Sequence, residues 1–206
     1  TKAASKTKDR KEVFEISDIE ATQLDFYEDT GALEFQAEVL HCIPLTKDMI
    51  SGLTFSGEVE SIPSYAVVTD RTLFYPEGGG QLGDQGRLLQ DDNEFVVLDT
   101  KSQDGVIFHF TEKPLVPGEV KGILDRDRRK QLMDHHTAVH IVGGAARNIL
   151  GPHIWQAGSN KGARYARLDI THHSRLTRQE IEAIEDLANN IVAVSYTHLR
   201  AHETGY

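Results

Sequence analysis

The sequence predicts an α+β protein in which strands come first and helices follow. Between residues 23 and 120, short strand-like segments are separated by Gly, Pro, Asp and Asn clusters, and over 33–39 apolar and polar residues alternate. This period of two is typical of half-buried strands. After Val120 the apolar residues recur at helical spacing instead. Six or so short strands predict a small barrel or sandwich, and the part that follows predicts two helices with a strand between them.

The elements follow in order from the same patterns. Strands are expected over 33–39, 65–69, 94–98 and 106–110. A helix is expected over 132–150, because Gly151-Pro152 is a strong stop signal. A strand is expected over 165–170. Thr177 and Glu180 then form a capping box that opens a helix whose apolar stripe ends at Ile191 and Val192.

Composition divides the chain into four segments. Residues 1–22 are rich in Lys and Glu and predict a linker or the end of a preceding domain. Residues 23–120 form the strand-rich segment, with a glycine-rich loop, and residues 121–192 the helical segment. Residues 193–206 do not continue the helical stripe and resemble a translated sequencing adaptor. We therefore expect the natural chain to continue beyond Val192, and the missing initiator Met also suggests a fragment.

Several classes of protein are excluded by simple counts. The 206 residues are enough for one large domain or two small ones. No apolar run approaches the roughly 18 residues of a membrane span, and the N-terminal residues lack the apolar core of a signal peptide. The only cysteine, Cys42, has no partner for an intramolecular disulfide. A reducing, cytoplasmic location is therefore expected.

The charges are unevenly distributed. The whole chain has a net charge of −10, yet residues 121–175 have a net charge of +6 and contain six of the ten histidines. A basic block in an acidic protein is typical of a face that contacts phosphates. A solvated helix start is the simpler interpretation of the charge alone. The basic residues that would contact phosphates are Lys121, Arg126, Arg128, Arg129 and Lys130.

The strongest local motif is the pair His136 and His140. Two histidines four residues apart lie on one face of a helix, close enough to share a metal ion. The Glu of a metalloprotease helix is absent between them. Zinc usually takes three or four protein ligands, and no CxxC or CxxxH follows in this chain. A fortuitous or core-packed pair is therefore the competing interpretation.

A glycine-rich segment from Phe74 to Gly86 is the second motif. Five glycines in nine residues exclude a stable helix or an ordinary strand. Such a loop allows close approach of a backbone or ligand, and its exposed N–H groups could bind an anion. No Gly-Lys-Ser/Thr sequence closes it, so it is not a P-loop. A tight, bulged hairpin is the alternative.

These motifs together resemble the editing domain of alanyl-tRNA synthetases. The resemblance rests on FYPEGGGQ with its neighbours, on HTAVH, on the WQAGS segment at 155–159 and on RLD at 167–169, in that order. It covers about residues 23 to 192. The run EVFEISDIEATQLDFYED at 12–29 is similar to the start of this domain in archaeal-type synthetases, and this favours a piece of the full synthetase.

The resemblance implies a small β-barrel followed by an α/β editing core that is incomplete here. It also implies hydrolysis of serine or glycine wrongly esterified to tRNA(Ala). In the family, zinc is bound by the HxxxH pair, matched by His136 and His140, and by a later CxxxH that this chain lacks. Gln156 matches a polar residue that helps to recognise the mischarged amino acid. The loop residues Gly78, Gly79, Gly80 and Gln81 would contact the substrate.

Because only two of the four family ligands are present, we expect this chain alone to be inactive and to bind zinc weakly or not at all. ATP and Mg²⁺ would be bound only in the synthetase's separate catalytic domain, which attaches alanine to tRNA(Ala). Two alternatives remain open. One is a free-standing editing deacylase of the same fold, and the other is a non-catalytic tRNA-binding module whose histidines are structural.

Overall fold

The computed structural model describes residues 13–27, 31–55, 59 and 61–203, with side chains described as far as Val194. The first twelve residues of the expected linker and the last three of the expected tail lie outside the described residues. The chain divides into two compact units. The first comprises residues 1–78 and 82–129, and the second comprises residues 79–81 and 130–206.

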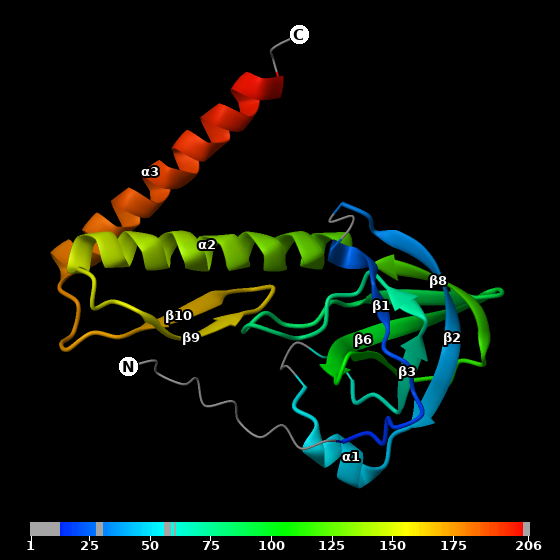
Figure 1. The fold of residues 1–206 in the computed structure, drawn as a ribbon. Coiled ribbons are helices and arrows are strands. Elements are labelled where there is room, and N and C mark those ends of the chain that lie inside the picture. The colour runs from blue at the N-terminus through cyan, green and yellow to red at the C-terminus, as the bar shows by residue number, and fades with distance from the viewer. Residues whose placement is uncertain (1–12, 28–30, 56–58, 60, 204–206) are drawn as a thin grey trace. The chain divides into compact units, whose positions relative to one another are not determined.

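The first unit is built on a closed six-stranded barrel, which confirms the expected α+β class with a small barrel (Figure 1). All neighbouring strands in it are antiparallel, and β2 pairs with β8 from Glu34 opposite Ile123 to Val39 opposite Gly118 to close it. In the order of pairing, the strands are β2 (Glu34–Pro44), β3 (Tyr65–Thr69), β7 (Val106–Thr111), β6 (Asn93–Gln103), β5 (Gly86–Gln90) and β8 (Gly118–Leu124).

Neighbouring side chains of β3 belong to two different apolar clusters. Val67 of β3 belongs to a buried cluster that also includes residues of β2, β5, β6 and β8, and this cluster fills the interior of the barrel. Its neighbours Ala66 and Val68 belong to a second cluster with Phe14 and Phe108. Successive side chains of a strand point to opposite faces, so β3 is buried on both faces.

The segment 13–22, for which we expected a linker or the end of a preceding domain, packs on the barrel through Phe14. Phe14 is buried, and its ring stacks on Phe108 with the centroids 4.0 Å apart. The short strand β1 (Gln23–Leu24) follows and pairs in parallel with β4 (Arg71–Thr72). The remaining short elements are a 3₁₀ turn, η1 (Asp25–Tyr27), and the helix α1 (Lys47–Gly52).

The long helix α2 (Arg126–Leu150) begins in residues of the first unit and continues through the second (Figure 1). It starts six residues before the apolar pattern does, because Asp125 caps it: Asp125 Oδ1 accepts a hydrogen bond of 3.0 Å from the Arg128 N–H. It ends where predicted. Gly151 has φ +112°, and its N–H donates to the Arg147 carbonyl at 3.0 Å.

The second unit also contains an antiparallel pair, β9 (Gln156–Lys161) and β10 (Ala166–Ile170), and the helix α3 (Arg178–Glu203). The capping box is confirmed, since the Thr177 N–H donates to Glu180 Oε2 at 2.7 Å and the Glu180 N–H to Thr177 Oγ1 at 3.3 Å. Apolar residues of α2 and α3, including Ala145, Ile184 and Ala188, form one buried cluster.

The backbone of α3 remains helical through Glu203, beyond Val192, where the amphipathic stripe ends. In the part of the chain that the structure describes, no helix combines the length and apolar composition needed to cross a membrane.

Candidate functional site

The histidine pair lies near the middle of α2, and the structure brings its two rings together. The ring centroids of His136 and His140 are 5.0 Å apart, as their spacing of four residues predicts. His136 Nδ1 lies 2.9 Å from Gln81 Oε1. A carbonyl oxygen only accepts, so Nδ1 carries the proton and the lone pair is on Nε2. A ligating histidine normally donates its second ring N–H in this way.

The tip of the glycine-rich loop brings Gln81 to this histidine. Gly80 has φ +79°, and a Cβ atom there would lie only 2.5 Å from the Ser159 carbonyl oxygen. Only glycine fits such a position. The Lys161 N–H donates to the Gly80 carbonyl at 2.7 Å, and Gln81 forms an isolated parallel bridge with Lys161. The close approach made possible by the glycines is therefore to the backbone of β9.

Lys161 is a residue that the sequence analysis missed. It is only 2% exposed, and its Nζ donates to the Gly79 carbonyl at 2.7 Å. Burial lowers the pKa of Lys161 below its usual value. No motif marks this lysine, and lysine is rarely buried, so nothing in the sequence distinguishes it from a surface residue.

The surroundings of His136 favour its neutral form. Its pKa is lowered, first by burial and then by the positive charges of Lys161 and His140. A neutral imidazole with an uncommitted Nε2 is the form that binds a metal ion. The positive charge of Lys161 also favours an anionic or carbonyl group at this point, because opposite charges attract most strongly where water is excluded.

Gln156 lies at the start of β9 and is exposed. Its Nε2 donates to Ser159 Oγ at 3.1 Å, and Ser159 is the residue on which Gly80 packs. Gln156 is thus connected to the loop tip through one side chain. Of the four predicted loop residues, Gly79, Gly80 and Gln81 belong to the second unit with the histidines, whereas Gly78 belongs to the first.

The arrangement of the two histidines fits two of the four ligands that a zinc ion would take. Their spacing, the proton on His136 Nδ1 and the lowered pKa of His136 fit two ligands of a tetrahedral ion. Among the residues that the structure describes, the one group of three or more possible metal ligands lies elsewhere, at His153, His172 and His173. Further ligands at His136 and His140 would have to come from other groups.

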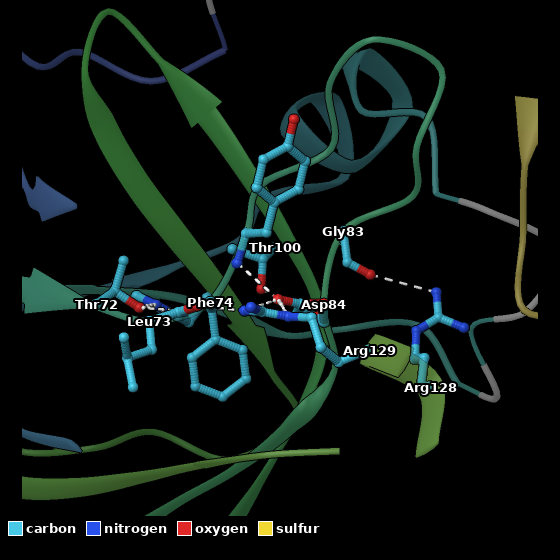
Figure 2. Close-up of polar contacts among 10 residues, drawn as sticks. Thr72, Leu73, Phe74, Gly83, Asp84, Thr100, Arg128 and Arg129 are labelled. Carbon is cyan, nitrogen blue, oxygen red and sulfur yellow. Dashed lines mark hydrogen bonds and ion pairs between the residues drawn. The ribbon is translucent and has the colours of Figure 1, made fainter. Parts of the chain in front are cut away.

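The basic residues before the histidines have two different roles. Arg128 and Arg129, which we expected to contact phosphates, are buried in the first unit (Figure 2). Arg129 Nε donates to Asp84 Oδ2 at 2.8 Å and its Nη2 to the Leu73 carbonyl at 2.5 Å, while Arg128 Nη2 donates to the Gly83 carbonyl at 3.3 Å. These guanidinium groups hold the base of the glycine-rich loop.

Asp84, the partner of Arg129, is almost fully buried. Burial raises the pKa of this carboxyl, and the charge and hydrogen bonds of Arg129 oppose the rise. The Tyr75 N–H also donates to Asp84 Oδ2, at 2.8 Å.

Because Arg128 and Arg129 are buried, the prediction that they contact phosphates is corrected. For the exposed residues Arg126 and Lys130 it remains a prediction.

A cavity of about 370 Å³ lies in the second unit. None of the predicted site residues lines it. Its walls are mainly apolar and come from α2, β10 and α3, with Val142, Leu168 and Ile184 among them.

Comparisons with known proteins place the chain in a family. The model of the family described as tRNA synthetases class II (A) matches residues 1–128. The chain is 40% identical over 193 residues to the alanine–tRNA ligase of Haloquadratum walsbyi, which covers 93% of this chain and 19% of that protein. It is 44% identical over 178 residues to that of Natronomonas pharaonis, covering 86% of this chain and 18% of the relative.

The alanine–tRNA ligase of Metallosphaera sedula is 42% identical over 183 residues, which cover 87% of this chain and 18% of the relative. The chain thus spans about a fifth of the length of the curated relatives it matches. The family model covers more than half of the chain, including the whole barrel. The chain therefore belongs to the class II (A) family of tRNA synthetases.

Proposed function

We propose that this chain is the editing region of an alanine–tRNA ligase, and that its second unit contributes to hydrolysis of serine or glycine esterified to tRNA(Ala). The observation that carries the proposal is a direct contact between two motifs: Gln81 of the glycine-rich loop accepts a hydrogen bond from His136 of the HxxxH pair. The names of the relatives support the substrate class, since each is an alanine–tRNA ligase.

Editing is needed because a pocket for alanine cannot fully exclude glycine or a small hydroxyl-bearing side chain by binding alone. In the whole ligase, ATP and Mg²⁺ would serve the attachment of alanine, in residues outside this chain. The editing site would then remove the amino acids that were attached wrongly.

The residues of the second unit would divide this work. His136 and His140 would bind zinc through one ring nitrogen each, and Gln81 would fix the orientation of the His136 ring. Zinc, when bound, would polarise the ester carbonyl or activate water. Lys161 would attract the electron-rich ester or the terminal phosphate. Gln156, exposed next to Ser159, would offer its amide to the hydroxyl of a seryl group.

The test is deacylation of seryl-tRNA(Ala) by a chain extended to the length of the relatives. Replacing His136 and His140 by Ala should reduce the rate by more than about 100-fold, because even second-shell changes at metal sites cost 10- to 100-fold. The matched control is His41→Ala, which removes an exposed histidine of β2 in the barrel. A double variant as fast as the control would contradict the metal site.

The second candidate is a tRNA-binding module without catalysis. The observation that favours it is that the described residues provide only two ligands at His136 and His140. In that case the extended chain would bind tRNA(Ala) and leave the seryl ester intact, with or without zinc. A free-standing editor would instead hydrolyse the ester without any ATP-binding domain in its natural chain.

A further inference from the structure

Three histidines outside the HxxxH pair gather at one end of the second unit. One ring nitrogen each from His153, His172 and His173 lies within 4.8 Å of the other two. The ring centroids of His172 and His173 are 4.4 Å apart, and those of His153 and His172 are 5.3 Å apart. His153 comes just after α2, and the other two come just after β10, so the cluster joins two connections of the fold.

The backbone holds these two connections together. The Thr171 N–H donates to the Trp155 carbonyl, and the Trp155 N–H donates to Thr171 Oγ1, both at 2.9 Å. Thr171 Oγ1 donates in turn to the His153 carbonyl at 2.8 Å. These bonds keep the backbone at His153 next to that at Thr171, the residue before His172.

Gly151 makes room for the first ring. Its φ of +112° is unfavourable for a side chain, and a Cβ atom there would lie 3.3 Å from His153 Nδ1. The turn that ends α2 therefore brings the His153 ring back over the backbone, with its Nε2 facing His172.

The distance between two of the nitrogens is close to that between two ligands of one metal ion. His153 Nε2 and His172 Nδ1 are 3.0 Å apart. Two nitrogens that each lie 2.0–2.1 Å from a tetrahedral ion are about 3.3 Å from each other. The other nitrogen of His172, Nε2, lies 3.4 Å from Ser174 Oγ. A hydroxyl on the second nitrogen is the kind of outer partner that metal-bound histidines have.

Negative charge lies beside the cluster. Glu180, in the first turn of α3, has a lowered pKa, first because of the hydrogen bonds from Thr177 and then because of His172 and His173. Its Oε2 accepts from the Thr177 N–H and hydroxyl, at 2.7 and 2.8 Å. A fixed carboxylate offsets part of the positive charge that a divalent ion would bring.

We propose that His153, His172 and His173 form a second metal site, which takes a divalent transition-metal ion such as Zn²⁺ and links the end of α2 to the start of α3. It shares no residue with the HxxxH pair. Three imidazoles and an open fourth position suit zinc. Because the ligands come from two connections, the bound ion would stabilise the folded second unit.

The experiment titrates Zn²⁺ into the full chain in a background that lacks the other HxxxH pairs, with His136, His140, His198 and His202 replaced by Ala. The amount and affinity of bound zinc are measured by competition with a chromophoric chelator. The sequence predicted weak or no zinc binding because that prediction considered only the HxxxH pair; with the second cluster we expect one zinc ion per chain and a rise in melting temperature on zinc addition. Co²⁺, used as a spectroscopic probe, should give the visible absorption of a tetrahedral site.

Replacing His172 by Ala in this background should weaken zinc binding by at least tenfold, since removal of a ligand costs no less than loss of an outer partner. His41→Ala, in the barrel, is the matched control and should change nothing. Far-UV circular dichroism without metal verifies that each variant is folded. No bound zinc in the background, or equal binding after His172→Ala and His41→Ala, would overturn the proposal.

Discussion

His109 is a fully buried histidine in the barrel, and its surroundings fix its protonation. Its Nδ1 lies 3.1 Å from the Val67 carbonyl, so Nδ1 carries the proton. Its Nε2 lies 2.8 Å from Thr72 Oγ1 and accepts the hydroxyl proton. Thr72 Oγ1 in turn accepts the Phe74 N–H at 3.0 Å. The histidine thus connects β7, β3 and the start of the glycine-rich loop as a neutral residue.

Burial lowers the pKa of His109 to about 4. In the unfolded chain this histidine would have a pKa of about 6.5. As the pH falls from about 6.5 toward 4, the unfolded state takes up a proton that the folded state does not, so the folded state loses stability. We expect the loss to be about 3 kcal/mol over this interval. Unfolding by urea at pH 7 and pH 4 measures it. In His109→Gln the pH dependence should be smaller by this amount, and an unchanged dependence would contradict the assignment.

Arg129 should contribute strongly to the stability of the barrel. Replacing Arg129 by Met leaves the Asp84 carboxyl buried without its cation, which should destabilise the barrel by about 3–5 kcal/mol. The adjacent variant Lys130→Met is the control. Lys130 pairs with Asp134 at 2.5 Å, but both side chains are more than half exposed, so the loss should stay below about 1 kcal/mol. Thermal unfolding followed by circular dichroism compares the two; equal losses would refute the structural role of Arg129.

At the scale of elements, the glycine-rich loop offers a pair of adjacent positions with different constraints. Gly79 and Gly80 both have positive φ, +58° and +79°. A Cβ atom at Gly79 would contact nothing within 4 Å, whereas one at Gly80 would collide with Ser159. Gly79→Ala should therefore lower the free energy of unfolding only through the unfavourable left-handed backbone conformation of alanine, by about 1–2 kcal/mol.

Gly80→Ala should destabilise the protein more than Gly79→Ala does. The loop tip must then also move away from β9, and this movement would separate Gln81 from His136. Trp155, the only tryptophan in the chain, lies in the second unit and reports its unfolding by fluorescence. Nitrogen-15 spectra of the His136 ring report the bond to Gln81. If both alanine variants left these spectra unchanged, the loop would not position the histidine.

The regular elements could largely be predicted from local patterns. The alternation at 33–39, the short apolar runs at 65–69 and 106–110, the capping box at Thr177 and the stop at Gly151 each depend on a few neighbouring residues. The two-residue strands β1 and β4 have no such pattern and exist only because they pair with each other. The burial of Phe14 likewise depends on Phe108, far along the chain.

The site could be predicted only in part for the same reason. The spacing of His136 and His140 is local, but the partner of His136 is 55 residues away and that of Lys161 is 82 residues away. Arg129 looks like an exposed phosphate ligand until Asp84 is placed next to it. Charge and motif spacing identify candidates, whereas burial, which decides their role, depends on the complete fold.

For the whole molecule, the uneven charge predicts how tRNA would bind. We expect the pair Arg126→Ala and Lys130→Ala to weaken binding to a tRNA acceptor stem and to reduce the salt dependence, by about 0.7–0.9 in the log–log slope for each phosphate that the variant no longer neutralises. Filter binding at several salt concentrations measures the slope. The control, Lys47→Ala with Lys113→Ala, removes two exposed lysines of the strand-rich segment, residues 23–120. An equal change in slope for both pairs would show that the basic block has no special role.

The loop that carries Gln81 also determines how the protein can be divided. Its residues 79–81 belong to the second unit, while the chain on either side belongs to the first. A fragment that starts at Lys130 would lack this three-residue strip, so Lys161 would lose its acceptor at Gly79 and His136 its acceptor at Gln81. The second unit is therefore not a self-contained cassette that a single cut could release. Transplanting it into another protein would require the loop to be supplied with it.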